Sequence, residues 1–204
     1  MTGAHTAAGT APSAAPKEIY GVPARCTGCR SCEMACAVEH SQSKSLFGAI
    51  TETPPPRRRI YVEAVGTVAV PVACRHCDEA FCANACITGA IRRDARGFVV
   101  LDESRCIGCN SCIMLCPFGV IQKDEARHVA VKCDLCPDLP GPACVAACPT
   151  DALRFQEAGD FARSRRASAA TVGAAAAAGG NGGAGDDGGL GGAAGGSEAA
   201  AGAA

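Results

Sequence analysis

Short apolar runs recur along the chain, and each one leads into a segment that is rich in cysteine. Residues 19–22, 68–70, 98–101 and 129–131 are dominated by β-branched and other strand-forming residues, so they predict four short strands. Residues 60–65 have the same character and predict one more strand. Strands this short, separated by polar loops and single helical turns, predict an α+β fold built from small sheets.

Sixteen cysteines follow these apolar runs in four groups, and no cysteine lies outside a group. The groups are Cys26, Cys29, Cys32 and Cys36; Cys74, Cys77, Cys82 and Cys86; Cys106, Cys109, Cys112 and Cys116; and Cys133, Cys136, Cys144 and Cys148. The first and third have the spacing CxxCxxCxxxC, whereas the second widens the middle gap to four residues and the fourth widens it to seven. CxxCxxCxxxC is the ligand pattern of a [4Fe–4S] cluster, so the four groups predict four clusters.

The last three groups end in similar tails, at residues 86–91, 116–121 and 148–153. The repeated unit is therefore a strand, a cysteine loop, one helical turn and a second strand. It resembles half of a bacterial-type ferredoxin, and such halves work in pairs. The first three cysteines of a group lie on one tight loop and converge on one cluster. The fourth lies one helical turn later and faces away, so it ligates the cluster of the paired half.

The four halves allow two pairings. Adjacent pairing joins the first group to the second and the third to the fourth, whereas nested pairing joins the second to the third and the first to the fourth. The 19 residues between Cys86 and Cys106 suit a simple hairpin linker, but the 37 residues between Cys36 and Cys74 do not. Those 37 include three prolines and three arginines at residues 54–59 and the predicted strand 60–65. They indicate an inserted hairpin and loop, which favours nesting.

The predicted folded part spans residues 17–156, between two tails of simple composition. Residues 1–16 and 157–204 consist mostly of Ala, Gly, Ser and Thr, so they cannot bury enough apolar surface to offset the entropy of ordering. We therefore expect both tails to be disordered. Nesting divides the folded part into an outer module at 17–50 and 127–156, an inner module at 66–126 and an insertion at about 41–65.

The apolar core of this chain must be thin. The hydrophobic fraction of 48% is misleading because Ala and Cys supply much of it, and the chain has no Trp, two Tyr and six Phe. Metal ligation can replace a core because its free energy is available only to the folded chain, so we expect the metal-free protein to be largely unfolded.

The formal net charge of −1 counts the thiols as neutral. Thiolates around four oxidised cores would bring the loaded protein to about −9. Five basic residues beside the cysteines would soften that negative field: Arg25, Arg30, Arg75, Arg105 and Lys132. A net anion without a basic stripe argues against nucleic acid as a partner.

The sequence shows no signal for export and no segment that could span a membrane. The N-terminal residues lack a basic region, an apolar core and a twin arginine, and no stretch of eighteen apolar residues occurs. We therefore expect a cytoplasmic protein, or one that reaches a membrane only through a partner. No glycine-rich phosphate loop follows a strand, and no serine or histidine stands in a nucleophile context, so we expect electron transfer without catalysis.

The same residues allow other interpretations. A zinc-binding structural or regulatory protein is the alternative from another class, but zinc sites pair two separated CxxC knuckles and have no use for a third cysteine in one loop. His76 is expected to be an ordinary exposed residue, and so is His40, although His40 could tune the cluster beside it. Met34 and Met114 are expected to pack against cluster faces.

Two further features bear on function. The arginines at residues 57–59 are either a solvated turn or a docking patch for an acidic redox partner. Gly28 and Gly108 precede the second cysteine of their groups and let backbone amides approach a cluster closely, whereas His76 and Leu135 hold the equivalent positions. We therefore expect the four clusters to differ in potential.

The group order, with its widened second and fourth members, resembles the four-cluster ferredoxin subunits of the dimethyl sulfoxide reductase, formate dehydrogenase and hydrogenase systems. The resemblance covers about residues 19–153. The segments CAVEHS at 36–41 and PRRRIYVE at 56–63 are similar to the iron–sulfur proteins associated with nickel carbon monoxide dehydrogenase. Phe81 and Ile87 depart from the family pattern, which often has proline there, so the loop of the second group is expected to be looser.

The resemblance implies nested pairing and a ligand set for each cluster. These sets are Cys26, Cys29, Cys32 and Cys148 for cluster 1; Cys74, Cys77, Cys82 and Cys116 for cluster 2; Cys106, Cys109, Cys112 and Cys86 for cluster 3; and Cys133, Cys136, Cys144 and Cys36 for cluster 4. It also implies a relay of electrons from a redox enzyme such as carbon monoxide dehydrogenase to a hydrogenase or similar acceptor. The alternative within the family is the electron-transfer subunit of a molybdopterin oxidoreductase or formate dehydrogenase complex.

Overall fold

A computed structural model describes residues 16–177 of the 204-residue chain. The predicted disorder of residues 1–15 and 178–204 concerns segments outside this described part. The chain divides into two units, at residues 1–165 and 166–204, and the cysteine groups all belong to the first.

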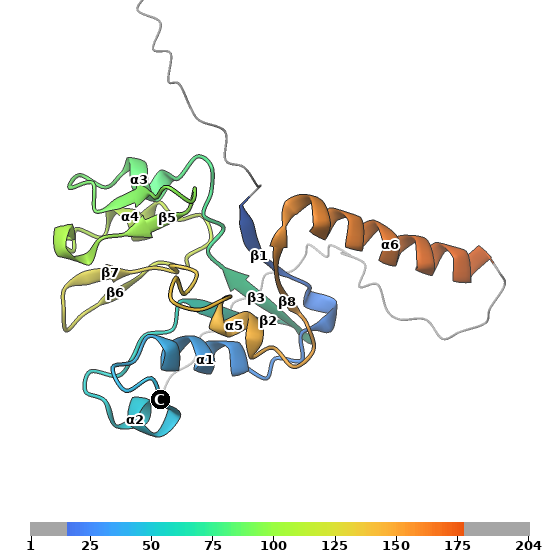
Figure 1. Cartoon of the computed structure of the whole chain (residues 1–204), viewed down its shortest axis with the longest axis horizontal. Helices are drawn as coiled ribbons and strands as arrows, with labels where there is room; N and C mark the ends of the chain where they lie inside the picture. The colour runs from blue at the N-terminus through green and yellow to red at the C-terminus, as the bar shows by residue number, and fades with distance from the viewer. Residues whose placement is uncertain (1–15, 178–204) are drawn as a thin grey trace, which may run out of the picture. The chain divides into compact units, whose positions relative to one another are not determined.

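The first unit is built on four antiparallel two-stranded sheets, joined by short helices, which is the α+β class (Figure 1). The paired strands are β1 (Lys17–Gly21) with β8 (Leu153–Glu157), β2 (Ile60–Val65) with β3 (Val68–Ala73), β4 (Ile91–Arg93) with β5 (Val99–Leu101), and β6 (Gln122–Asp124) with β7 (Val129–Val131). The five strands expected from the apolar runs are confirmed. The first and last strands of the unit pair with each other, so the ends of the cysteine region are brought together.

One helix begins just before the third cysteine of each group. These helices are α1 (Ser31–Glu39), α3 (Phe81–Asn84), α4 (Ser111–Met114) and α5 (Ala143–Ala146). The last three are single turns, as the repeat predicts. Helix α1 is nine residues long and runs on past Cys36, because the first group lacks the tail that turns the chain back in the others.

The remaining short elements frame the first and third groups and the insertion. The 3-10 helices η1 (Pro23–Arg25) and η2 (Glu103–Arg105) lead into the first and third groups. Helix α2 (Leu46–Thr51) lies in the insertion, where the Ser45 hydroxyl caps it by accepting a 3.1 Å hydrogen bond from the Gly48 N–H.

Two small hydrophobic cores hold the unit together, and cysteines form part of both. One joins β1, α1, β2, α5 and β8 around Ile19 and Val62, and the other joins β4, β5, α4 and β7 around Ile91 and Val99. A third, smaller cluster contains Tyr61, Cys74 and Val120. The buried apolar side chains of the described residues are mainly Val, Ile, Ala and Cys, so the prediction of a thin core is confirmed.

Regular structure continues after residue 156 as far as residue 177, in contrast to the prediction for this part of the C-terminal tail. Helix α6 (Ala158–Ala177) follows β8 directly. Its first turns are tied to the first unit, because the Phe161 ring stacks on Tyr20 with the centroids 4.4 Å apart. We did not expect this helix because its composition is simple. It forms because alanine is the strongest helix former and because the contact of Phe161 with Tyr20 anchors its start.

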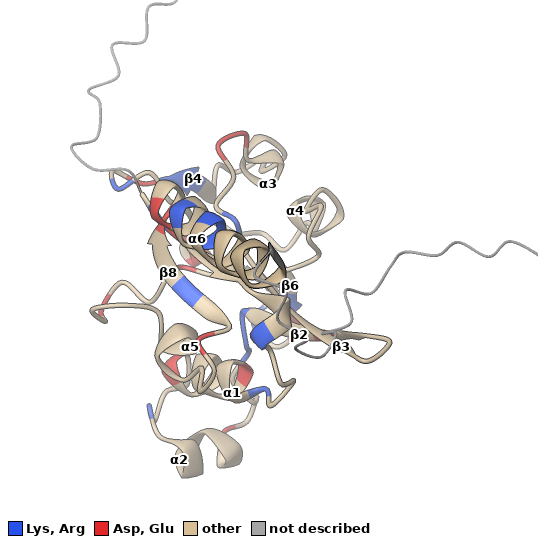
Figure 2. Cartoon of the chain, turned by 90° about the vertical axis from the view of Figure 1, so that its right-hand side faces the viewer, with Lys and Arg blue, Asp and Glu red and all other residues tan. Residues whose placement is uncertain are grey.

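Lys and Arg residues lie on several elements of the described part, including β4, β8 and α6 (Figure 2). Within residues 16–177, no helix is both long and apolar enough to cross a membrane.

Candidate metal centres

The four cysteine loops share one backbone feature. The residue before the second cysteine has a positive φ in every group: 70° at Gly28, 46° at His76, 68° at Gly108 and 64° at Leu135. This left-handed conformation folds each loop back on itself so that the cysteines can converge. For a residue other than glycine it costs about 1–2 kcal/mol. His76 and Leu135 are both buried, so their packing offsets that strain.

His76 is not the exposed residue that we expected. Its side chain lies inside the protein with 6% of the residue exposed, and its ring meets Phe98 edge to face with the centroids 5.6 Å apart. Burial, followed by the nearby charge of Lys132, lowers the pKa of His76 to about 3. The imidazole is therefore a neutral packing group, placed there by the left-handed loop.

Three cavities are each lined by four cysteines, three from one group and the fourth from another. The cavities contain Cys26, Cys29, Cys32 and Cys148; Cys74, Cys77, Cys82 and Cys116; and Cys106, Cys109, Cys112 and Cys86. These sets have the members that the family resemblance implies for clusters 1, 2 and 3. Four thiols around a small apolar cavity are a donor set that suits an iron–sulfur cluster.

The remaining four cysteines also lie close together, where α1 packs on α5. Cys36 and Cys144 are buried in the first core, and Cys133 packs against it. Burial raises the pKa of the Cys144 thiol, and the neighbouring Cys133, Cys36 and Cys136 raise it further. All sixteen cysteines therefore fall into four sets of neighbouring thiols.

Backbone amides point at several of these sulfur atoms. The Ile91 N–H donates to Cys86 Sγ and the Ala130 N–H donates to Cys106 Sγ, each over 3.4 Å. Cys36 has no following tail to supply a donor. Its Sγ instead accepts a 3.2 Å hydrogen bond from the N–H of Arg59, which belongs to the insertion. Amide donors stabilise negative charge on sulfur, so the insertion replaces a function of the missing tail.

A polar network beside Cys36 was not predicted from the sequence. His40 Nε2 lies 3.2 Å from Asp134 Oδ1, and Arg59 Nη1 donates to Asp134 Oδ2 over 2.5 Å. His40 Nδ1 lies 2.7 Å from the carbonyl oxygen of Cys36. Burial lowers the pKa of His40, but its bonds to Asp134 and Cys36 outweigh burial and raise the pKa to about 9. The His40 side chain is only 12% exposed, so our prediction of an exposed His40 is wrong.

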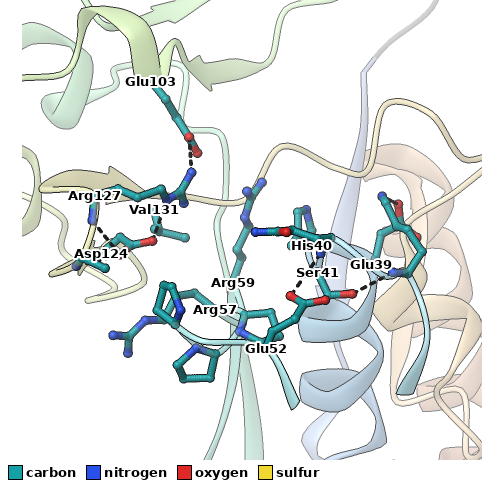
Figure 3. Close-up of a pocket in the computed structure, with 16 residues that line it drawn as sticks. Glu39, His40, Ser41, Glu52, Arg57, Arg59, Glu103, Asp124, Arg127 and Val131 are labelled. Carbon is teal, nitrogen blue, oxygen red and sulfur yellow. Dashed lines mark hydrogen bonds and ion pairs between the residues drawn. The ribbon is translucent and has the colours of Figure 1, made fainter. Parts of the chain in front are cut away.

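Two of the three arginines at residues 57–59 form ion pairs within the protein. Arg59 is committed to Asp134, and Arg58 lies 3.6 Å from Glu33 and over the ring of Tyr61. Neither is a freely solvated residue or a free docking charge. Of the three, only Arg57 makes no ion pair with another residue of the described part. Arg57 and Arg59 line a polar cavity of about 550 Å³ together with His40, opposite Asp124 and Arg127, and no cysteine lines it (Figure 3).

Met34 and Met114 do not pack against the cysteine sets as predicted. They are 54% and 77% exposed. Each lies two residues after the third cysteine of its group, which is about 200° around the helix, so its side chain points away from the thiol. Periodicity could have excluded the prediction. By contrast, nothing in the sequence identified Asp134 as a partner of His40.

Comparisons with known proteins agree on the chemistry of these sites. A family model described as a 4Fe-4S dicluster domain matches residues 65–158, and one described as a 4Fe-4S binding domain matches residues 23–39. An iron-sulfur protein of Rhodospirillum rubrum is 44% identical over 153 residues, which are 67% of this chain and 80% of that protein. The electron transport protein HydN of Escherichia coli (strain K12) is 40% identical over 66% of this chain and 85% of its own length. The thiosulfate reductase electron transfer subunit PhsB of Salmonella typhi is 39% identical, over 64% of this chain and 70% of its own length.

Proposed function

Because this chain belongs to the family of 4Fe-4S electron-transport proteins, we propose that it is a non-catalytic electron carrier with four [4Fe–4S] clusters. The observation that carries the proposal is the composition of the three cysteine-lined cavities. Each combines three cysteines of one group with the fourth of another, which is the ligand arrangement of paired ferredoxin halves.

The ligands that we assign are those implied by nested pairing. They are Cys26, Cys29, Cys32 and Cys148 for cluster 1; Cys74, Cys77, Cys82 and Cys116 for cluster 2; Cys106, Cys109, Cys112 and Cys86 for cluster 3; and Cys133, Cys136, Cys144 and Cys36 for cluster 4. The pairing of β1 with β8 supports an outer module that holds clusters 1 and 4. Contacts between α3 and α4 support an inner module that holds clusters 2 and 3.

The packing of the cysteines supports a linear relay in the order 1, 4, 2, 3. Cys32 and Cys144 share one core, which joins the first pair of sites. Cys133 packs beside Cys74 in the smallest core and joins the outer module to the inner one. Cys82 and Cys112 share the remaining core, which joins the last pair.

The ends of this relay are open to the surface. Cys29 of cluster 1 and Cys109 of cluster 3 are the two exposed cysteines, whereas Cys74 and Cys136 of the middle clusters are buried. We therefore propose that electrons enter at one end cluster and leave at the other, and that the protein's own role is to hold the sites in line and exclude water from the middle ones.

We propose a relay from a low-potential donor such as carbon monoxide dehydrogenase to a hydrogenase, in the cytoplasm or at a membrane through a partner. The second candidate is an electron-transfer subunit of a molybdopterin oxidoreductase or formate dehydrogenase complex. The likeness to the thiosulfate reductase electron transfer subunit PhsB, a named subunit of a reductase, favours this candidate.

Iron analysis and paired serine variants test the cluster assignment. Anaerobically purified protein is expected to contain about sixteen iron atoms per molecule. A colourless zinc protein would refute the proposal. Nested pairing predicts that Cys148→Ser alters the same electron paramagnetic resonance signal as Cys26→Ser, because both thiols ligate cluster 1. If Cys86→Ser matched Cys26→Ser instead, adjacent pairing would be correct.

Anaerobic capture of the protein from its own cells tests the partner. Recovery of carbon monoxide dehydrogenase or a nickel hydrogenase supports the first candidate. Recovery of a molybdopterin subunit supports the second and leaves the cluster assignment unchanged.

A further inference from the structure

Lys132 is a buried cation between two of the cysteine sets. It follows β7 directly, precedes Cys133 and is only 3% exposed. Its Nζ donates to the carbonyl oxygens of Val99 and Cys133, the second over 3.1 Å. Among residues 16–177, no carboxylate lies within ion-pair distance of it. A buried ammonium held only by neutral carbonyl groups is costly, so a counter-ion is needed.

The surroundings of Lys132 indicate where that counter-ion lies. Its side chain lines the cavity of Cys74, Cys77, Cys82 and Cys116. The other basic groups near this cavity do not compete for the role. The His76 ring packs edge to face on Phe98, and the Arg75 guanidinium lies 5.6 Å from the centre of the Tyr20 ring. Arg93 donates to the carbonyl oxygens of Cys77 and Asp78, but it is exposed to water. Lys132 is therefore the internal positive charge of the cavity.

Lys132 directly precedes the first cysteine of its group, and the residues at this position in the other groups are not buried cations. The residue before the first cysteine is Arg25 in the first group, Ala73 in the second and Arg105 in the third. Arg25 and Arg105 are exposed, so water screens them. The second group has no charge of its own at this position, and the fourth group supplies one from inside the protein.

We propose that Lys132 is the counter-ion of cluster 2 and raises its reduction potential above those of the end clusters. The proposal rests on the four-cluster function proposed above. One electron taken from a reductant adds one negative charge at the site, and no proton needs to move. A fixed positive charge in a water-poor interior favours that added charge, so Lys132 stabilises the reduced state.

The test is an anaerobic potentiometric titration of the loaded full-length protein, followed by electron paramagnetic resonance. Cys77→Ser identifies the signal of cluster 2. Lys132→Met removes the charge and is expected to lower the equilibrium constant for reduction of cluster 2 about tenfold, which is about 59 mV for one electron. Lys132→Arg is expected to keep the midpoint. Arg25→Met, at the equivalent exposed position, is expected to leave all midpoints in place.

One further variant and an iron analysis control for the loss of a hydrogen-bond donor and for the loss of a cluster. Lys132→Gln removes the charge but retains a donor for the two carbonyl groups, so it separates charge from hydrogen bonding. If both neutral variants lose one cluster by iron analysis while Lys132→Arg keeps it, the charge is needed and the proposal stands. Unchanged midpoints in Lys132→Met, equal shifts of all clusters, or loss of a cluster in Lys132→Arg as well would overturn it. A wild-type iron content far below sixteen would refute the four-cluster function instead.

Discussion

Gly28 and Gly108 occupy equivalent positions in their loops, but we expect Gly108→Ala to destabilise the protein more than Gly28→Ala. Both have a left-handed backbone, with φ of 70° and 68°. Backbone strain alone therefore makes alanine at either position lower the free energy of unfolding by about 1–2 kcal/mol. The space around the new methyl group separates the two.

At Gly28 the added Cβ would lie 3.4 Å from the Ala69 Cβ, which is an ordinary contact. At Gly108 it would overlap the carbonyl oxygen of His128, so the backbone of the β6–β7 turn must move. Such overpacking costs about 1–3 kcal/mol more. We expect total costs of about 1–2 kcal/mol for Gly28→Ala and about 2–5 kcal/mol for Gly108→Ala.

The measurement is the anaerobic rate of iron loss to a chelator, which follows the population of opened protein when opening is fast. The additional cost at Gly108 corresponds to about 5- to 150-fold faster loss than in Gly28→Ala. The loss should begin at cluster 3, because His128 lies two residues before Ala130, whose N–H donates to Cys106 Sγ. Equal rates in the two variants would refute the steric reasoning.

Three further predictions concern the metal, the pH and a buried carboxylate. Removal of iron should abolish most of the far-ultraviolet circular dichroism of the folded part, since the core is too small to hold it; an unchanged spectrum would contradict this. Burial raises the pKa of the Cys32 and Cys112 thiols to about 11, so each must release a proton to ligate iron, and cluster retention against a chelator should fall as the pH falls. Retention that is independent of pH would count against it. Glu33→Ala should lower the free energy of unfolding by about 1–3 kcal/mol, because the Val62 N–H, 2.6 Å from the Glu33 carboxylate, loses its buried acceptor. Glu33→Gln keeps an acceptor, so it should lower the stability less and lose iron more slowly in the same chelator assay.

The strands and single-turn helices were predictable because each apolar run is short and each cysteine spacing fixes one turn. The environment of the cysteines was harder to predict. His76 is polar and lies in a loop, so its sequence context indicates exposure, whereas the left-handed turn and Phe98 bury it. The spacing of the cysteines also indicates which thiols of one group lie close together. It does not indicate which group supplies the fourth thiol of each set, unless a pairing of the groups is assumed.

The long-range contacts of the insertion could not be predicted from the sequence either. The run of arginines has the composition of a surface loop, and nothing local shows that Arg59 meets Asp134, which is 75 residues later. Arg59 directly precedes β2 and Asp134 lies in the cysteine loop of the fourth group, so the contact joins two separate loops and no local pattern encodes it. Helix α6 was missed because its composition is simple and because the contact of Phe161 with Tyr20 also joins distant residues.

The hydrogen bond from the Arg59 N–H to Cys36 Sγ has a consequence for engineering. In the second repeat, the amide that donates to the last cysteine, Cys86, belongs to the tail of the same repeat, at Ile91. In the first repeat, the amide that donates to the last cysteine, Cys36, comes from the insertion, 23 positions away. A shortened insertion would change the electronic character of one proposed redox site while all sixteen proposed ligands remained in the sequence. The same dependence gives a designer a way to adjust that site from outside the repeat.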